Sequence, residues 1–191
     1  MARTQFFTAM SLDGFLADEN GSLDWLYSSP HDGEGRWNEF FSNVGAMAMG
    51  ATTYRWALEN HALLEKPDTW HEWYEDRPCW IFSRGDLPAI PGADLHFVRG
   101  DVEPIHRAMS AVAGARNIWI VGGGDLAGQF HAAGLLDDLL LSIVPVTLGS
   151  GAPLMTRRIE GLHVESVRQS GQRIEVHYTL RAPSTAVETA N

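Results

Sequence analysis

The chain has 191 residues, of which 45% are hydrophobic, and 24 acidic against 14 basic residues give it a formal net charge of −10. This length and apolar content suit one domain with a full core and are short for two. The negative charge disfavours nucleic acid and anionic membranes as partners, whereas a small anionic ligand remains compatible with a few locally placed cations.

The termini and the single cysteine give no sign of export. Cys79 has no partner for an internal disulfide, and no apolar run approaches the ~20 residues of a membrane span. We therefore expect a cytoplasmic protein with one domain over residues 1–182. The small and polar residues 183–191 predict a disordered tail.

In the first half of the chain, short apolar segments alternate with helical patterns. This alternation is typical of a sheet with crossover helices. The predicted elements are a strand over 4–10, a long loop over 11–26, a helix over 36–44, a strand over 45–50, and a helix that opens with Thr52 at its cap position.

The aromatic segment 66–80 contains three tryptophans and a tyrosine. It is interpreted either as a surface helix that packs its rings on the core or as a lid that closes over a substrate.

The second half continues the alternation and ends differently. Strands are predicted over 79–83, 93–98 and 117–121, and helices over 102–115 and 125–135. A long apolar strand over 136–149 contains Pro145, which indicates an edge, a bulge or a bend there. Alternating residues on both sides of Ser170 and Gly171 predict a closing antiparallel hairpin, so the expected fold is α/β with a mostly parallel central sheet.

Three consecutive glycines, Gly122, Gly123 and Gly124, separate the strand over 117–121 from the next predicted helix. Without side chains, they would let a pyrophosphate approach the amides at the helix start. The alternative is a tight turn that needs positive φ. The residues also match the dinucleotide fingerprint G-x-G-x-x-A, although that fingerprint normally follows the first strand of its sheet and this match comes late.

Two further junctions have the same character. Gly50, Thr52 and Thr53 offer amides and hydroxyls to a phosphate, and Ser83 with Arg84 could clamp the extra phosphate that distinguishes NADP from NAD. A helix cap and a solvated loop are the respective alternatives. In open sheets of this kind, ligands bind beyond the carboxyl ends of the strands, where all three junctions fall.

A family resemblance rests on five segments in order: "MSLDGFLADENGSLDWL", "MGATTY", "IFSR", "IWIVGGGDL" and "PVTLGSGAPL". Over residues 3–181 the chain resembles the dihydrofolate-reductase-like superfamily, most closely the C-terminal reductase domain of bacterial riboflavin-biosynthesis proteins and its stand-alone relatives. The resemblance implies a three-layer fold, an NADPH-dependent reductase and a homodimer, which would also account for the apolar strand near the end of the chain.

The resemblance also implies site residues. Gly50, Thr52 and Thr53 would hold the cofactor phosphates, Ser83 and Arg84 the adenosine 2′-phosphate. The stretch Gly122, Gly123, Gly124, Asp125 and Leu126 would hold the pyrophosphate and the nicotinamide side.

The early loop would then cover the nicotinamide. Asp13 is the favoured carboxylate near the reacting atoms, Asp24 the alternative acid, and Trp25 an apolar wall. Hydride transfer to a C=N or C=O group needs a proton source or an ordered water, and a carboxylate with a burial-raised pKa could serve. Glu34 corresponds loosely to the pterin-binding acid of dihydrofolate reductases.

The expected activity is therefore NADPH-dependent reduction of a small heterocyclic substrate, of the 5-amino-6-(5-phosphoribosylamino)uracil reductase type. A dihydrofolate or pterin reductase and a non-catalytic NADPH sensor are the alternatives. The zinc-deaminase elements H-x-E and P-C-x-x-C are absent, and the eight histidines show no metal-ligand spacing, so no metal is expected.

Overall fold

The computed structural model describes residues 2–27 and 35–180 of the chain. Ten strands lie in this part: β1 (Thr4–Ser11), β2 (Phe15–Ala17), β3 (Val44–Gly50), β4 (Cys79–Phe82), β5 (Leu95–Val98), β6 (Asn117–Val121), β7 (Asp138–Val144), β8 (Ala152–Pro153), β9 (Leu162–Ser170) and β10 (Arg173–Leu180). Six helices accompany them: α1 (Asp24–Tyr27), α2 (Gly35–Ser42), α3 (Ala51–His61), α4 (Asp68–Tyr74), α5 (Val102–Ala113) and α6 (Gly124–Ala132).

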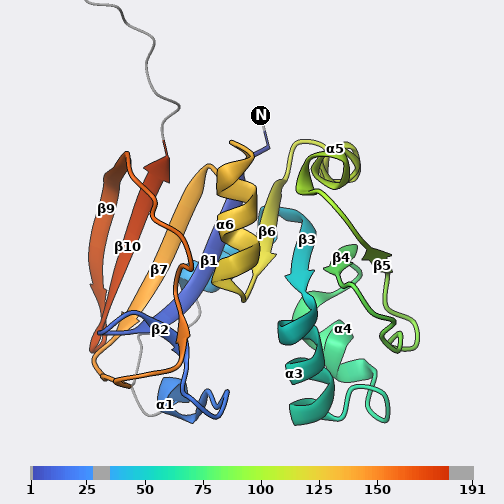
Figure 1. Ribbon diagram of the computed structural model, residues 1–191, viewed down its shortest axis with the longest axis horizontal. Helices are drawn as coiled ribbons and strands as arrows, with labels where there is room; N and C mark the ends of the chain where they lie inside the picture. Colours follow the sequence, from blue (N-terminus) through green and yellow to red (C-terminus); the bar gives the residue numbers. More distant parts are fainter. Residues whose placement is uncertain (1, 28–34, 181–191) are drawn as a thin grey trace, which may run out of the picture.

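Eight strands form one sheet in the order β5-β4-β3-β6-β1-β7-β10-β9 (Figure 1). The pairings from β5 to β7 are parallel, whereas β10 pairs antiparallel with both β7 and β9. The mostly parallel sheet with an antiparallel C-terminal hairpin is confirmed.

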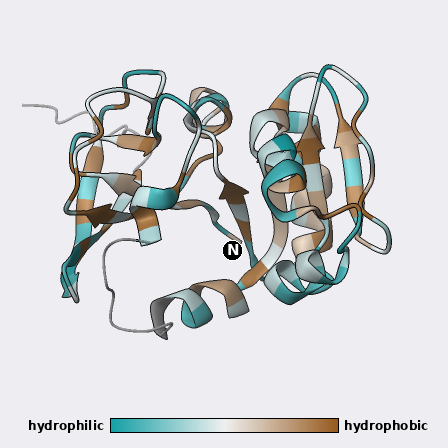
Figure 2. Cartoon of the chain, turned by 90° about the horizontal axis from the view of Figure 1, so that it is seen from below, coloured by the Kyte–Doolittle hydropathy of each residue, from teal (hydrophilic) through white to brown (hydrophobic). Residues whose placement is uncertain are grey.

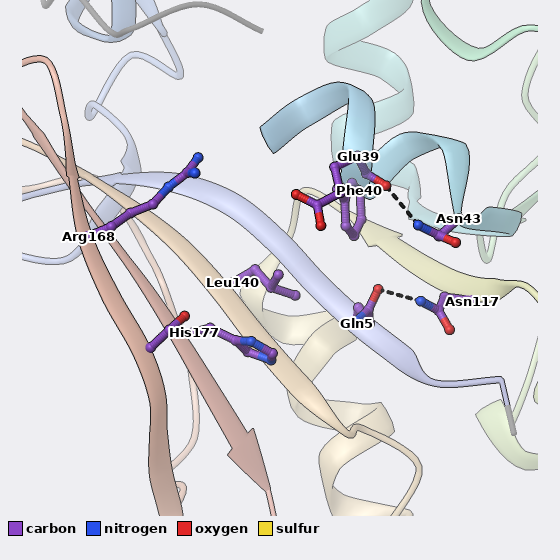
Figure 3. Close-up of a pocket in the computed structure, with 9 residues that line it drawn as sticks. Gln5, Glu39, Phe40, Asn43, Asn117, Leu140, Arg168 and His177 are labelled. Carbon is purple, nitrogen blue, oxygen red and sulfur yellow. Dashed lines mark hydrogen bonds between the residues drawn. The ribbon is translucent and has the colours of Figure 1, made fainter. Parts of the chain in front are cut away.

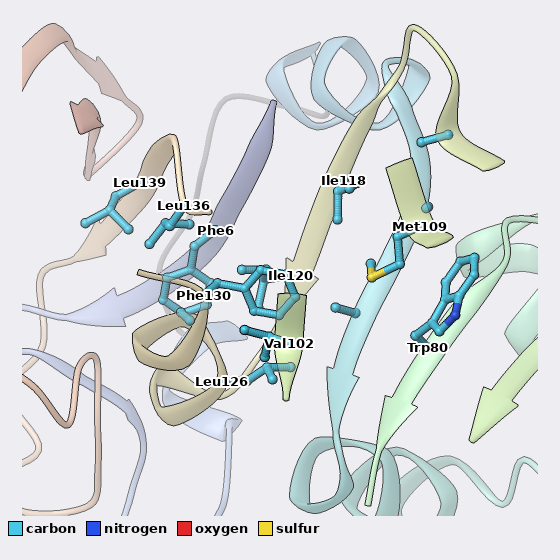
Figure 4. Close-up of a cluster of buried hydrophobic side chains, with 14 of the residues drawn as sticks. Phe6, Trp80, Val102, Met109, Ile118, Ile120, Leu126, Phe130, Leu136 and Leu139 are labelled. Atoms are coloured by element: carbon cyan, nitrogen blue, oxygen red, sulfur yellow. The ribbon is translucent and has the colours of Figure 1, made fainter. Parts of the chain in front are cut away.

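Two apolar layers hold the helices against this sheet. Phe6, Ile120 and Phe130 belong to the layer under α5 and α6 (Figure 4). Met47, Tyr54 and Trp70 belong to the layer on the opposite face, under α2, α3 and α4. Strands buried on both faces read as nearly continuous apolar runs, and for this reason the sequence located β3 and β6 well.

The apolar strand near the end of the chain has an internal explanation. β7 lies between β1 and β10, and Leu139, Leu140 and Leu141 are all buried within this one chain. It ends at Val144, directly before Pro145, so the proline marks the end of the strand. The apolarity of β7 therefore gives no argument for a dimer.

Two local predictions are wrong. The loop predicted over 11–26 contains β2 and α1, and β2 pairs with β8, which was not predicted. Gly50, with φ of −78° and ψ of 154°, occupies the cap position of α3, so Thr52 lies within the first turn instead.

The segment over 66–80 does contain the predicted surface helix, α4, whose Trp70 is buried. Figure 2 shows how the hydrophobic residues gather on the strands and the inward faces of the helices.

The tail predicted over 183–191 and residue Glu34 lie outside the described residues. Within the described part, no helix has the length and apolarity needed to cross a membrane.

Candidate active site at the carboxyl edge of the sheet

Six parallel strands end at one edge of the sheet, because β5, β4, β3, β6, β1 and β7 are neighbours with the same direction. Helices α3 and α6 begin at this edge, directly after β3 and close after β6 (Figure 1). Their first turns carry amide groups that no residue within the helix can satisfy. All three glycine and hydroxyl junctions predicted from the sequence therefore lie along the same edge.

The ends of β3 and β6 meet through Gly122 and Thr53. Gly122 has a φ of +71°, and a Cβ built on it would lie 2.4 Å from Oγ1 and 2.7 Å from Cγ2 of Thr53. For Gly123 the nearest such atom is the same Oγ1, at 3.9 Å. The Thr53 side chain thus lies against the glycine backbone, and a positive φ and a close approach both explain the glycine at position 122.

The start of α3 is open. A Cβ built on Gly50 would meet no atom within 4 Å, and no side chain caps the helix. Thr52 is exposed on the first turn. Together with the partly exposed Gly122 and Gly123, this region presents main-chain amides and the hydroxyls of Thr52 and Thr53 at the surface.

The other members of the predicted glycine stretch are less accessible. Gly124 is buried, and a Cβ on it would lie 2.0 Å from the carbonyl oxygen of Leu154. Leu126 is 5% exposed and packs in the core. Asp125 is exposed and accepts a hydrogen bond from Gln129 at 2.8 Å. Any ligand contact of Gly124 or Leu126 would therefore have to come through the main chain.

At the end of β4, the two predicted residues differ in what they offer. The buried Ser83 hydroxyl donates to the carbonyl of Gly85 at 2.7 Å and accepts from the Gly85 amide at 3.3 Å, so it shapes its own turn. Arg84 is exposed beside it. The guanidinium, more than the hydroxyl, remains available to an anion.

Asp13 lies in a turn after β1 and bonds within the protein. Its carboxylate accepts from the Ser11 hydroxyl at 2.6 Å, from the Gly149 amide at 2.7 Å and from the Leu148 amide at 3.1 Å. These hydrogen bonds lower the pKa of Asp13 to about 2, and the bond from Ser11 contributes most to the shift. The expectation that burial raises the pKa of this acid is wrong, because the side chain is exposed and its charged form is hydrogen-bonded.

Two further predicted residues lie on α1. Trp25 is buried in α1, and Asp24 is exposed at the start of that helix. The carbonyl of Leu26, on the same helix, accepts from the Arg173 guanidinium at 2.6 Å, which ties α1 to β10.

One segment of this edge, which includes the residues "PVTLGSGAPL" that carry part of the resemblance, takes a course that the sequence did not predict. Residues 145–158, here called the strap, run from the end of β7 across the carboxyl edge to α6. The strap is held by main-chain bonds from Leu12 N to Val146 O at 2.7 Å and from Leu154 N to Gly14 O at 2.8 Å. Gly149 and Gly151, both with positive φ, were the signal in the sequence for such a tightly folded segment.

A separate hollow of about 340 Å³ lies at the opposite, amino edge of the sheet, between α2 and the strands β7, β9 and β10 (Figure 3). Its polar side chains bond to one another: Asn117 donates to Gln5 at 3.0 Å, and Gln5 donates to Asp138 at 3.0 Å. Asp138 is fully buried and also bonds Arg3 at 2.6 Å and His177 at 2.8 Å. This network ties β1, β6, β7 and β10 together, and we interpret it as structural.

No cluster of three or more His, Cys, Asp or Glu side chains suited to a metal occurs among the residues that the structure describes.

Comparison with known proteins agrees with this geometry. The YwjB protein of Bacillus subtilis (strain 168), whose activity is uncharacterized, is 29% identical over 179 residues, covering 92% of this chain and 97% of its own. A solved structure from Shewanella sp. PV-4 has a TM-score of 0.74 at 24% identity and covers 95% of this chain and 100% of its own.

A third relative is larger. It is the diaminohydroxyphosphoribosylaminopyrimidine deaminase/5-amino-6-(5-phosphoribosylamino)uracil reductase of Thermotoga maritima, with a TM-score of 0.65 at 16% identity. The match covers 94% of this chain and 57% of the Thermotoga chain. The likeness to these two structures establishes the dihydrofolate-reductase-like fold.

The sequence profile of the RibD C-terminal domain matches residues 3–176, nearly the whole described chain. The chain belongs to the RibD C-terminal domain family, a family of reductases.

Proposed function

We propose that the protein is an NADPH-dependent reductase of a small heterocyclic substrate, with an activity of the 5-amino-6-(5-phosphoribosylamino)uracil reductase type. The observation that carries the proposal is the contact between Gly122 and Thr53, which joins the glycine turn after β6 to the open start of α3 at one edge of the sheet. In a molecule with a net charge of −10, main-chain amides are a way to bind a diphosphate without a basic surface.

The residues at this edge fit NADPH in number and kind. The amides of Gly122 and Gly123 and the hydroxyls of Thr52 and Thr53 would hold the diphosphate, with Gly50 leaving room for it. Gly124, Asp125 and Leu126 would border the nicotinamide side through their main chain. NADPH, when bound, supplies the hydride, and the protein orients it and excludes water.

Arg84 would bind the adenosine 2′-phosphate, with Ser83 shaping the turn that presents it. A guanidinium pairs with a phosphate through charge-assisted hydrogen bonds, so Arg84 would favour NADPH over NADH.

The proton that completes the reduction has to come from elsewhere than Asp13 at neutral pH, because the pKa of that acid is lowered to about 2. Asp24 or an ordered water would supply the proton, and Trp25 would form an apolar wall.

We also propose that the protein is a cytoplasmic homodimer.

Two alternatives stay open to test. One observation favours a non-catalytic NADPH sensor. The carboxylate of Asp13, the acid expected near the reacting atoms, is engaged in hydrogen bonds within the protein. A dihydrofolate or pterin reductase would need Glu34 to face the nicotinamide.

The test is a fluorescence titration of the protein with NADPH and NADH, followed by absorbance-monitored oxidation against pyrimidine and pterin substrates. Replacing Arg84 by Ala should weaken NADPH binding about tenfold and leave NADH binding unchanged. Arg107→Ala, on the exposed side of α5, is the matched control and should change neither. Equal affinity of the unmodified protein for both cofactors would contradict the role of Arg84. Binding without turnover would favour the sensor.

A further inference from the structure

The turn that contains Asp13 faces the strap. The Gly14 amide donates to the Ser11 carbonyl at 3.0 Å, which closes the turn, and the Ser11 hydroxyl also accepts from the Phe15 amide at 2.9 Å. The side chain of Asp13 is thereby held toward the amides of Leu148 and Gly149, 135 and 136 residues later in the chain.

The strap has little freedom at the points where it touches the rest of the protein. A Cβ on Gly151 would lie 2.0 Å from the carbonyl oxygen of Ala17, and a Cβ on Gly124 would lie 2.0 Å from that of Leu154. Thr156 reaches the carboxylate of Asp125 at 3.4 Å. The strap thus packs between β2 and the first turn of α6, beside the amides of the proposed cofactor site.

The early part of the strap is held mainly by Asp13. Around residues 147–150, the hydrogen bonds to the rest of the protein run to the Asp13 carboxylate, apart from one from the Ser150 hydroxyl to Glu19 at 3.3 Å, within the residues that the structure describes. Both Oδ atoms of Asp13 are used, and both accept from main-chain amides.

We infer that Asp13 is a positioning residue, whose carboxylate fastens the strap over the carboxyl edge of the sheet, and that it does not donate the proton to the substrate. The second half of this inference rests on the proposed reductase function, whereas the first does not. The lowered pKa of Asp13 agrees with it, since an acid that is charged throughout the neutral range carries no proton to give.

The test compares two substitutions of Asp13. In Asp13→Asn, the amide oxygen can still accept from the Leu148 and Gly149 amides, and the amide nitrogen can donate to the Ser11 oxygen, but no carboxyl proton exists. In Asp13→Ala, all of these bonds are lost. Glu19→Gln is the matched control, because its amide oxygen can still accept from Ser150.

Hydrogen–deuterium exchange of the strap is the first readout. Asp13→Ala should accelerate exchange at Leu148 and Gly149 about tenfold or more, since amide hydrogen bonds to a charged group are lost. Asp13→Asn should retain most of the protection, and Glu19→Gln should retain all of it. The Met47 amide, bonded to the Pro78 carbonyl within the core, is the internal reference for intact folding.

Turnover is the second readout. The inference predicts that Asp13→Asn keeps kcat within about tenfold, whereas loss of a general acid costs roughly 10²- to 10⁴-fold. Unchanged exchange in Asp13→Ala would overturn the fastening role whether or not any substrate is turned over. An Asp13→Asn variant with a protected strap and the rate loss of a missing acid would overturn the exclusion of proton donation. If no substrate is reduced by the unmodified protein, the proposed function fails, and the exchange result still decides the fastening role.

Discussion

Gly122 and Thr53 can be tested together by a double-mutant cycle. A Cβ at position 122 would lie 2.4 Å from Oγ1 and 2.7 Å from Cγ2 of Thr53, inside any real contact distance, and 3.1 Å from its Cβ. The residue would also have to keep a φ of +71°, which costs a non-glycine residue about 1–2 kcal/mol. Overpacking adds about 1–3 kcal/mol, so Gly122→Ala should lower the free energy of unfolding by about 2–5 kcal/mol.

The cycle separates these two contributions. Thr53→Ala removes Oγ1 and Cγ2 and leaves the φ penalty together with the 3.1 Å approach to the Cβ of residue 53, which a shift of a few tenths of an ångström relieves. In that background, Gly122→Ala should therefore cost about 1–2 kcal/mol, which gives a coupling of about 1–3 kcal/mol. Urea unfolding with linear extrapolation measures all four proteins. Gly85→Ala is the control, because a Cβ there would meet no atom within 4 Å and its φ is not positive.

A coupling of zero would refute the contact. If Gly122→Ala costs the same with and without the Thr53 side chain, the hydroxyl does not lie against the glycine backbone, and the two helix starts are not joined as described.

Further predictions concern the amino edge and the core. Desolvation alone would raise the pKa of Asp138, but hydrogen bonds from Arg3, His177 and Gln5 outweigh it, and the pKa in the folded protein is lowered. The ionised Asp138 therefore stabilises the fold at pH values above its unfolded pKa of about 3.9, and this stabilisation is lost as the pH falls through the lower folded pKa. Asp138→Asn should lower the free energy of unfolding, measured with urea at pH 7, by about 2–4 kcal/mol. The difference in this free energy between the variant and the unmodified protein should shrink in acid, and a difference that stays constant with pH would count against the ion pair. Burial raises the pKa of the Cys79 thiol, so it should stay unreactive toward a thiol reagent until the protein unfolds, and rapid labelling of the native protein would contradict its burial.

Much of the fold could be predicted because single stretches of sequence encode it. The apolar run over 117–121 and the glycines after it locate β6 and the start of α6, and the alternation around Gly171 locates the hairpin of β9 and β10. These signals are local, since a strand buried on both faces must be apolar along its whole length.

The rest depends on pairings between distant segments. β2 and β8 have three and two residues, and each is a strand only because the other lies beside it. Asp13 lies within the predicted early loop, but its pKa is lowered by the Ser11 hydroxyl and by amides at positions 148 and 149, and no local pattern reveals those two distant amides. Thr52 looked like a cap because threonine favours that position, yet the extended backbone of Gly50 takes it.

The central claim is that the open main chain at the ends of β3 and β6 binds the diphosphate of NADPH. Its most direct measurement is an NMR titration of the ¹⁵N-labelled protein with NADPH. The account predicts that the amide signals of Gly122, Gly123 and Thr53 shift most and saturate together, while those lining the amino-edge hollow, such as Asn117, stay in place. Saturable NADPH binding that leaves the first three signals unmoved would contradict the account, as would the absence of any binding.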